Sequence, residues 1–555
     1  MAVRIGVRNL GRYREILAVF TRHGFGWLWA ELGLTGLLPL GQRWSRPTQD
    51  GASAQAVHLR QAFEELGATF VKLGQVLSTR SDLLPPEYIA ELSKLQDAVP
   101  PVPYAQVVEV LQEELGREAQ ELFAELDPEP LAAASIGQVH AARLPNGEPV
   151  VVKVQRPGVA EAIEQDLAIL LDLARLITEH TGFGRDYDVL ALAQEFAFNL
   201  RCELNYVREG ENAERFRRMF QGDPDVCIPR IHWPYTTERV LVMQRVTGIK
   251  ITDLEGLAQA GLDRRRLAAN FVRLMLEEMF VHGFFHADPH PGNLYVLEDG
   301  RIGLIDFGMI GRLDESLQEG LSRLFLAVAK GHSDRVLDEM LFLGMLRGKV
   351  NSQALRRDLD HMIACYAHRS AQEIAASNLF AELMALARRH RLRMPADLVL
   401  MARAMAISEG IGLQLDPDFQ FVPFSTPYLE QYWLHRHSPL RVGEKVVDGM
   451  VEMTEFGLSF PRRFTRLVTL LEQGELGGQI ELRGMEHTLD RVQRMVHQLS
   501  ASVLVGALIV GLSQFMHMVA PEGFLQEYAG RFFGFLFVIA IVLGFWLLIS
   551  IVRSR

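Results

Sequence analysis

Residues 283–311 carry a spacing of polar side chains that few folds can accommodate. The chain reads GFFHADPHPGNLYV over 283–296 and GLIDFGMIG over 303–311. Asn293 follows Asp288 by five residues, and Asp306 stands at the end of an apolar stretch. Carboxylate and amide oxygens are the ligands that hard divalent cations prefer. The spacing therefore predicts a metal site assembled between a loop and the end of a strand.

A lysine upstream indicates the chemistry of that site. Lys153 stands in the middle of the apolar stretch VVVKV, where an unpaired ammonium group is costly. In protein kinases a strand lysine meets the nucleotide phosphates, a catalytic loop supplies a base aspartate and a metal-binding asparagine, and the DFG aspartate binds metal. The same order predicts that Asp288 is the catalytic base, that Asn293 and Asp306 hold Mg²⁺ or Mn²⁺, and that Lys153 meets the phosphates of ATP.

The histidines of this stretch have two other interpretations. HADPH places His286 and His290 at a spacing that suits zinc ligands, although no convincing third ligand follows. His286 can also be a packing residue that orients the loop.

Three features depart from an ordinary protein kinase. The loop that should cover the phosphates reads AAASIGQV, so Ala132, Ala133, Ala134 and Ser135 stand where glycines are usual. Alanine restricts the backbone and changes how closely phosphates approach, so we expect nucleotide binding to survive while transfer is altered. The segment after Asp306 leaves no room for a long activation segment and lacks an APE motif, so a peptide-docking platform is missing. GATFVKLGQVLSTRSDLLPPEY precedes the nucleotide lobe, where generic kinases have nothing.

The remaining organisation follows from the period of the apolar residues. Helical patterns fill 57–125, and short β-branched stretches broken by turn residues predict a small sheet between 130 and 250. Beyond it the pattern is helical to about residue 475, apart from strands around Tyr295 and Leu304. At 555 residues the chain exceeds a single core, so several structural units are expected.

Charge and cysteine content exclude some classes of function. A net charge of −11 argues against nucleic-acid binding, which normally requires a basic excess. Cys202, Cys227 and Cys365 are far apart and odd in number. Neither a disulfide framework nor a cysteine-based zinc site is expected, and a reducing compartment is the simpler interpretation.

Two regions of the chain suit a membrane. Residues 499–520 carry no acidic or basic side chain apart from His517, and residues 532–552 carry none. Each can cross about 30 Å of hydrocarbon, so a transmembrane hairpin is predicted, with buried core helices as the alternative. Arginines beyond both outer ends place the body of the chain in the cytosol. Residues 1–30 interleave arginines with apolar residues, which permits either a basic amphipathic helix on a membrane or an ordinary solvated helix.

Six motifs follow one another in a fixed order: FVKLGQ, AAASIGQVH, VVVKVQRPG, ELNYVREGENAERF, HADPHPGN and DFGMIG. With them the chain resembles the UbiB family of atypical kinase-like proteins, in its bacterial membrane-anchored branch. The resemblance implies an α+β, bilobal protein-kinase-like fold with an N-terminal helical extension and a C-terminal transmembrane helix hairpin. The expected segments are an N-terminal amphipathic helical region (1–60), a helical extension over the active site (61–130), an N-lobe (131–250), a C-lobe (251–475), a juxtamembrane helix (476–498) and two transmembrane helices (499–552).

The resemblance also assigns residues outside the kinase pattern. In the family, the lysine of a KxGQ motif points into the pocket and meets an ExD motif. Lys72 and Gln75 match the first motif and Glu203 the second, which implies catalytic roles for Lys72 and Glu203. Asn205 stands where aspartate is usual, which leaves one carboxylate fewer near Lys72.

Two further positions follow from the family pattern. Glu209 matches the helix glutamate expected to pair with Lys153. Gln244 stands in the hinge LVMQRVTG where glutamate is common, and the resemblance implies that Gln244 and Val246 contact adenine through the backbone.

Members of the family support biosynthesis of ubiquinone and related isoprenoid lipids, with ATP binding and ATPase activity. The resemblance implies an ATP-dependent multi-pass protein of the bacterial cytoplasmic membrane. Its expected ligands are ATP, Mg²⁺ or Mn²⁺, membrane lipids and isoprenoid-quinone precursors, and its candidate partners are quinone-pathway enzymes and a second copy of the chain. A small-molecule or lipid phosphotransferase and a non-catalytic membrane scaffold are the alternatives. Intact Lys153, Asp288, Asn293 and Asp306 argue against the scaffold.

Overall fold

The computed structural model describes residues 10–32, 52–80, 83–95, 99–181, 188–345, 351–367, 376–390, 392 and 395–436. The predicted juxtamembrane helix (476–498) and transmembrane hairpin (499–552) lie outside these residues. Within the described part, one helix, Asp397–Leu415, is long and apolar enough to cross a membrane, and 61% of its most apolar window is buried. Burial of this extent is typical of a core helix, and the helix therefore adds no support to a membrane span.

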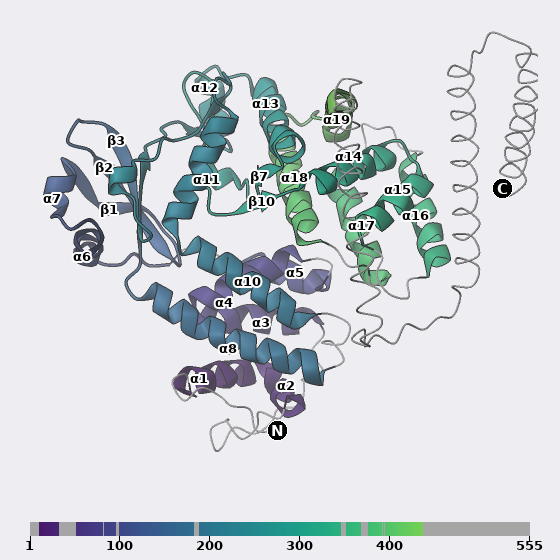
Figure 1. The fold of residues 1–555 in the computed structure, drawn as a ribbon, viewed down its shortest axis with the longest axis horizontal. Helices are drawn as coiled ribbons and strands as arrows, with labels where there is room; N and C mark the ends of the chain where they lie inside the picture. The colour runs from purple at the N-terminus through teal and green to yellow at the C-terminus, as the bar shows by residue number, and fades with distance from the viewer. Residues whose placement is uncertain are drawn as a thin grey trace, which may run out of the picture. The chain divides into compact units, whose positions relative to one another are not determined.

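An antiparallel sheet carries the predicted lysine strand. Its strand order is β1-β2-β3-β5, with β1 at Glu125–Ala133, β2 at Gly137–Arg143, β3 at Pro149–Gln155 and β5 at Val240–Gln244. Because side chains alternate across a strand, Val150, Val152 and Val154 are buried on one face and Lys153 lies on the other. Helices cover both faces: α6 (Tyr104–Leu115) and α7 (Ala119–Leu122) pack on the valine face, and α11 (Tyr206–Met219) lies on the lysine side (Figure 1).

Two further sheets contain the strands that flank Asp288, Asn293 and Asp306 in the sequence. One has the order β4-β9-β8-β6, and the other pairs β7 with β10. Their bounds are Val226–Cys227 (β4), Ile249–Lys250 (β6), Phe284–His286 (β7), Leu294–Val296 (β8), Ile302–Leu304 (β9) and Ile310–Arg312 (β10). The prediction of strands around Tyr295 and Leu304 is confirmed, since they are β8 and β9. The sequence did not predict β7 and β10, because strands of three residues are too short to display a period of two.

Helices make up the rest of the described C-terminal part. A π-helical segment, Glu277–Val281, continues α13, and α13 packs along α18. α14 begins soon after Asp306, because the carboxylate of Asp314 accepts a hydrogen bond from the backbone N–H of Leu317 and caps the helix. This early helix start agrees with the absence of a long activation segment. The bounds are Leu254–Gln259 (α12), Arg264–Leu276 (α13), Glu315–Ala329 (α14), Ser333–Phe342 (α15), Ser352–Ala367 (α16), Ala376–Arg389 (α17), Ala396–Leu415 (α18) and Phe421–Arg436 (α19).

A helical layer lies beside the first sheet and is built from two separate parts of the chain. Helices α3, α4 and α5, which precede β1, pack against α8 and α10, which are inserted between β3 and α11 (Figure 1). The bounds are Ala52–Leu66 (α3), Ala68–Thr79 (α4), Pro86–Leu92 (α5), Val159–His180 (α8) and Val189–Glu203 (α10). The insertion delivers Glu203, the last residue of α10, next to the helix that carries Lys72.

The first described helix, α1 (Leu10–Phe20), belongs to the same layer. Its apolar residues Tyr13, Ile16 and Leu17 are buried against α3, α4 and α8. At the edge of this buried face, Arg12 Nε donates to Asp166 Oδ1 of α8 at 2.8 Å. The apolar face of α1 is thus used inside the protein, which favours an ordinary helix over a helix lying on a membrane.

Candidate nucleotide and metal site

Lys153 and Glu209 form the central ion pair of the site. β3 supplies the lysine and α11 the glutamate, and Lys153 Nζ lies 2.8 Å from both Oε1 and Oε2 of Glu209. The ammonium group also lies 5.0 Å from the ring centroid of Tyr206, one helical turn earlier. Only 6% of the glutamate side chain is exposed, against 23% of the lysine side chain. The costly lysine in the apolar strand therefore has the partner that its position requires.

Asp306 belongs to the same electrostatic group. Burial alone would lower the pKa of Lys153, but the negative charges of Glu209 and Asp306 outweigh it and raise that pKa above its ordinary value. Burial works to raise the pKa of Asp306, yet the charge of Lys153 and the hydrogen bond from Gly308 lower it overall. For Glu209, burial and the charge of Asp306 raise the pKa against the opposing charge of Lys153. Two carboxylates thus share one ammonium group, and the excess negative charge suits a divalent cation.

The β8–β9 hairpin brings the two predicted metal ligands to one end of a sheet. Leu294 pairs with Leu304 in register, and Ile305 N donates to Asn293 O at 3.2 Å, so Asn293 lies opposite the residue before Asp306. Asp306 Oδ1 accepts from Gly308 N at 2.9 Å. One carboxylate and one amide are the donors with which Mg²⁺ is held when phosphates supply further oxygens. The donor set therefore fits a metal–nucleotide complex.

The zinc interpretation gains no support from the structure. No group of three or more His, Cys, Asp or Glu side chains within the described residues is arranged to hold a metal ion. Both histidines have other contacts, since His286 Nδ1 accepts from Asp288 N at 3.2 Å and His290 Nδ1 accepts from Gly292 N at 3.1 Å. His286 is 1% exposed and its ring lies 6.3 Å from the ring of Phe307. These contacts are those of a packing residue that orients the loop.

Asp288 meets an arginine that the sequence did not identify. Arg403 of α18 donates from Nη2 to Asp288 Oδ1 at 3.0 Å. The loop backbone is held separately, because His290 N donates to Asp288 O at 2.7 Å. An arginine within a helix as apolar as α18 is the signal that could have been followed, although it does not name a partner 115 residues away.

The alanine-rich segment divides between a strand and a tight turn. Ala132 and Ala133 pair with Val139 and Gln138 as the end of β1, and the turn closes through Ala134 N donating to Gly137 O at 2.8 Å. The buried hydroxyl of Ser135 has no hydrogen-bond partner among the described residues. An unpaired buried hydroxyl at this turn is a ready donor for a phosphate oxygen, so the turn fits a nucleotide.

The turn is tied to the segment that precedes the nucleotide lobe. Arg156 Nε donates to Ala134 O at 2.8 Å, and Arg156 Nη2 donates to Pro100 O at 2.7 Å. One guanidinium group thus joins the turn to the proline-rich connection between α5 and α6. This contact restrains the turn.

Lys72 and Glu203 form a second ion pair beside the first. Lys72 Nζ lies 2.6 Å from Glu203 Oε1, with 18% and 35% of the side chains exposed. The positive charge of Lys72 contributes to lowering the pKa of Asp306. Asn205 caps α11 through Arg208 N and donates from Nδ2 to Glu238 Oε1 at 3.1 Å. The structure therefore brings the Lys72–Glu203 pair to the Lys153–Asp306 group and gives Asn205 a capping role.

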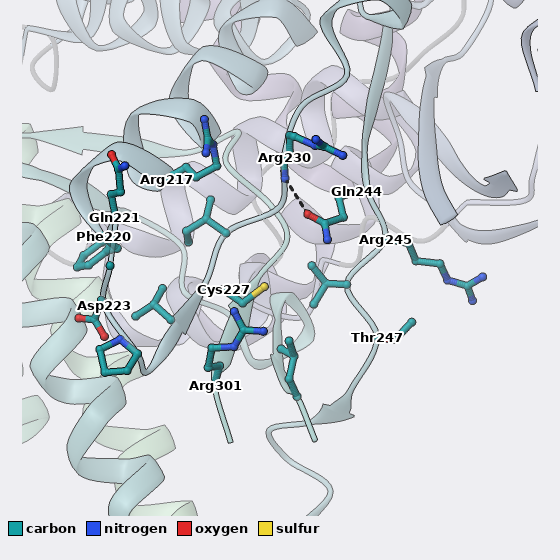
Figure 2. Close-up of a pocket in the computed structure, with 16 residues that line it drawn as sticks. Arg217, Phe220, Gln221, Asp223, Cys227, Arg230, Gln244, Arg245, Thr247 and Arg301 are labelled. Atoms are coloured by element: carbon teal, nitrogen blue, oxygen red, sulfur yellow. Dashed lines mark hydrogen bonds between the residues drawn. The ribbon is translucent and has the colours of Figure 1, made fainter. Parts of the chain in front are cut away.

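The hinge residues Gln244 and Arg245 form backbone hydrogen bonds within the protein. Gln244 N donates to Arg230 O at 2.8 Å, and Arg245 N donates to Pro149 O at 3.1 Å. The side chain of Gln244 turns toward Arg230 N, 3.4 Å away (Figure 2). Gln244 and Val246 both line a cavity at the hinge, and the predicted adenine contacts of their backbones stay a prediction.

A cavity of about 730 Å³ lies at this hinge but away from the ion pairs. Neither Lys153 nor Asp306 lines it. In Figure 2 the arginines around it spread in different directions, and Arg217, for example, pairs with Glu214 at 2.9 Å. The kinase-like group therefore lies outside this cavity.

Comparisons with known proteins match three regions of the chain. Residues 94–340 match the ABC1 atypical kinase-like domain, 359–420 the UbiB helical domain and 483–553 the ABC1/UbiB kinase-like C-terminal domain, the last outside the described residues. The chain is 36% identical over 467 residues to an uncharacterized protein of Synechocystis, across 82% of this chain and 80% of that protein. It is 35% identical over 461 residues to the probable protein kinase UbiB of Marinobacter nauticus, across 82% and 84%. It is 34% identical over 493 residues to the chloroplastic protein ACTIVITY OF BC1 COMPLEX KINASE 8 of Arabidopsis thaliana and spans 64% of that protein's length.

Proposed function

This chain belongs to the ABC1/UbiB family of atypical kinase-like proteins, and on that premise we propose that it is an ATPase that supports isoprenoid-quinone biosynthesis at the bacterial cytoplasmic membrane. The observation that carries the proposal is Lys153, 2.8 Å from Glu209 and electrostatically coupled to Asp306, because this arrangement holds a nucleotide phosphate and a cation together. The family resemblance supports the quinone pathway, and the name of the Marinobacter relative is consistent with it.

Each residue of the group has a separate task in this proposal. Asn293 and Asp306 would hold Mg²⁺ or Mn²⁺, which when bound neutralises charge on the phosphates. Lys153 orients the phosphates, and Glu209 keeps its ammonium group in place. Asp288 orients the water that attacks the γ-phosphate. The Lys72–Glu203 pair, 2.6 Å apart, would restrict the approach of a peptide and so favour water over a protein hydroxyl as the acceptor.

The early start of α14 favours a second candidate over protein phosphorylation. A helix capped at Asp314 leaves no peptide platform after Asp306, whereas a small molecule or lipid hydroxyl needs none. A phosphorylated product formed from labelled ATP and membrane extract would support a lipid or small-molecule phosphotransferase. Release of inorganic phosphate alone supports the ATPase.

Asp306→Asn tests the metal–nucleotide site. The substitution removes a charged metal ligand, so ATP affinity in the presence of magnesium should fall about tenfold or more, and hydrolysis should be lost. Asp299→Asn in the same hairpin is the matched control, because Asp299 is exposed and pairs with Arg301 at its far end. Equal affinity of wild type and Asp306→Asn for magnesium–ATP would refute the site.

Quinone and lipid profiles of a strain lacking the protein test whether it supports isoprenoid-quinone biosynthesis. Wild type and Asp299→Asn should restore the profile, and Asp306→Asn should not. Restoration by Asp306→Asn would instead support a non-catalytic scaffold.

The membrane location rests on residues 499–520 and 532–552, two stretches without Asp, Glu, Lys or Arg that also fall within the C-terminal family match. Hydrolysis would then release an apolar precursor from the bilayer into the reach of quinone-pathway enzymes.

A chain ending at Gln498 should lose most of its membrane attachment in fractionation. A cysteine in place of Glu527 should react with an impermeant reagent from the periplasmic side. Protection of that cysteine together with full solubility of the intact chain would contradict the hairpin.

A further inference from the structure

α18 is a core helix that carries one charged side chain into the nucleotide site. Its residues Leu398, Val399 and Ala404 are buried, and Arg403 lies among them with 30% of its side chain exposed. α18 contacts α13, β10 and α4, the helix of Lys72, and it lies within the region that matches the UbiB helical domain. Arg403 is thus the point at which this helical region reaches Asp288.

The contact has a geometry that leaves part of Asp288 free. Arg403 uses one nitrogen, Nη2, on one oxygen, Oδ1, and does not form a two-pronged pair. A carboxylate has acceptor sites on both oxygens, so Oδ2 can still accept a hydrogen bond from a nucleophile. The loop backbone is fixed by His286 and His290, which leaves the direction of the carboxylate to Arg403.

We propose that Arg403 is a positioning residue: it fixes the carboxylate of Asp288 so that Oδ2 faces and orients the attacking water. This inference rests on the proposed ATPase function. A guanidinium group is always charged, so its hydrogen bond to the carboxylate of Asp288 is charge-assisted and holds that oxygen in place. A loose phosphoryl-transfer transition state requires positioning and positive charge, with little proton abstraction. Arg403 supplies a positive charge, and its contact with Asp288 supplies the positioning.

The test compares five full-length variants with wild type: Arg403→Met, Arg403→Lys, Asp288→Asn, Arg403→Met with Asp288→Asn, and Arg389→Met. Arg389→Met is the control, because Arg389 of α17 makes a similar single contact of 3.1 Å with Asp358 of α16. Arg403→Met should lower kcat for ATP hydrolysis about 10- to 100-fold with KM for ATP changed less than about twofold, since misplacement of an attacking group affects the chemical step. Arg403→Lys should recover part of kcat, and Arg389→Met should match wild type.

The double variant shows whether Arg403 acts through Asp288 or independently of it. With Asp288→Asn already present, Arg403→Met should lower kcat no further, because the two residues act as a unit. An equal loss in both backgrounds, or an unchanged kcat in folded Arg403→Met, would overturn the proposal.

Thermal unfolding of the same proteins gives a readout that does not depend on turnover. The sum of the Tm shifts of Arg403→Met and Asp288→Asn should be larger than the Tm shift of the double variant. A sum equal to the shift of the double variant would overturn the pairing. If wild type binds magnesium–ATP but releases no phosphate, the ATPase proposal fails while the Tm comparison still reports on the Arg403–Asp288 pair.

Discussion

Replacing Glu278 by glutamine should make the stability of this protein less dependent on pH, because wild type loses free energy of unfolding as the pH rises toward 8 and the variant does not. Glu278 lies in the π-helical segment and is 0% exposed. Its Oε2 accepts a hydrogen bond from His286 N at 2.9 Å, and Oε1 has no partner among the described residues. Burial raises the pKa of Glu278 from its ordinary 4.5 to about 8. The neutral acid is therefore the form that anchors the catalytic loop at pH 7.

The direction of this pH dependence follows from the protons bound by the folded and the unfolded states. Between roughly pH 4.5 and pH 8 the folded protein holds a proton that the unfolded chain releases, so the free energy of unfolding falls as the pH rises and levels off above the folded pKa. From about pH 6 to about pH 9 this loss amounts to about 2–3 kcal/mol for one group. Glutamine keeps an oxygen for His286 N and does not ionise. Because the unfolding entropy scales with length, a chain of 555 residues shifts by about 1 °C per kcal/mol, so wild type should lose roughly 2–3 °C of Tm relative to Glu278→Gln over this interval.

Differential scanning calorimetry of the full chain at the two pH values measures the effect. Glu255→Gln, on the exposed side of α12, is the control for removal of a carboxylate. Its Tm should follow wild type at both pH values. Parallel pH dependence of wild type and Glu278→Gln would refute the assignment of a raised pKa to Glu278.

Three other substitutions test the nucleotide side of the site. A Cβ at Gly137 would overlap the hydroxyl of Tyr206, so Gly137→Ala should destabilise the protein by about 1–3 kcal/mol and weaken ATP binding, which calorimetry and ATP titration measure together. Glu209→Gln leaves Lys153 without its 2.8 Å carboxylate partner and should weaken magnesium–ATP binding about tenfold or more; unchanged affinity would contradict the pairing. Ala134→Gly should loosen the turn and change the ratio of ATP to ADP affinity, and identical titrations for both nucleotides would argue against a phosphate-covering role.

The sequence predicted those residues whose chemistry is unusual where they stand. Lys153 in an apolar strand requires a partner, and the structure supplies Glu209, whereas the metal role of Asp306 after another apolar strand stays a prediction. Glu209 followed only from a family resemblance, because an exposed helix glutamate and a buried one look alike in sequence. The structure supplies the burial and the 2.8 Å contacts that distinguish them.

Tertiary contacts account for what the sequence could not provide. Arg403 meets Asp288 across 115 residues, and nothing local to either residue specifies that contact. α10 approaches α4 because a long insertion follows β3, and a periodicity argument gives helices without giving their neighbours. The burial of Glu278 likewise arises from the packing around the π-helical segment, which the pattern EEMFV does not reveal.

The two carboxylates that would meet an incoming substrate are each held by a cation from a helix outside the kinase pattern. Lys72 of α4 holds Glu203, and Arg403 of α18 holds Asp288. α4 and α18 also contact each other, and under the proposed function we expect the helical layer and the C-terminal helices to restrict the approach of a peptide backbone. Under the same proposal, water is small enough to reach Oδ2 of Asp288, which the single contact from Arg403 leaves available, and hydrolysis needs no peptide platform. Under the proposed function, the same contacts that exclude a protein substrate therefore favour hydrolysis.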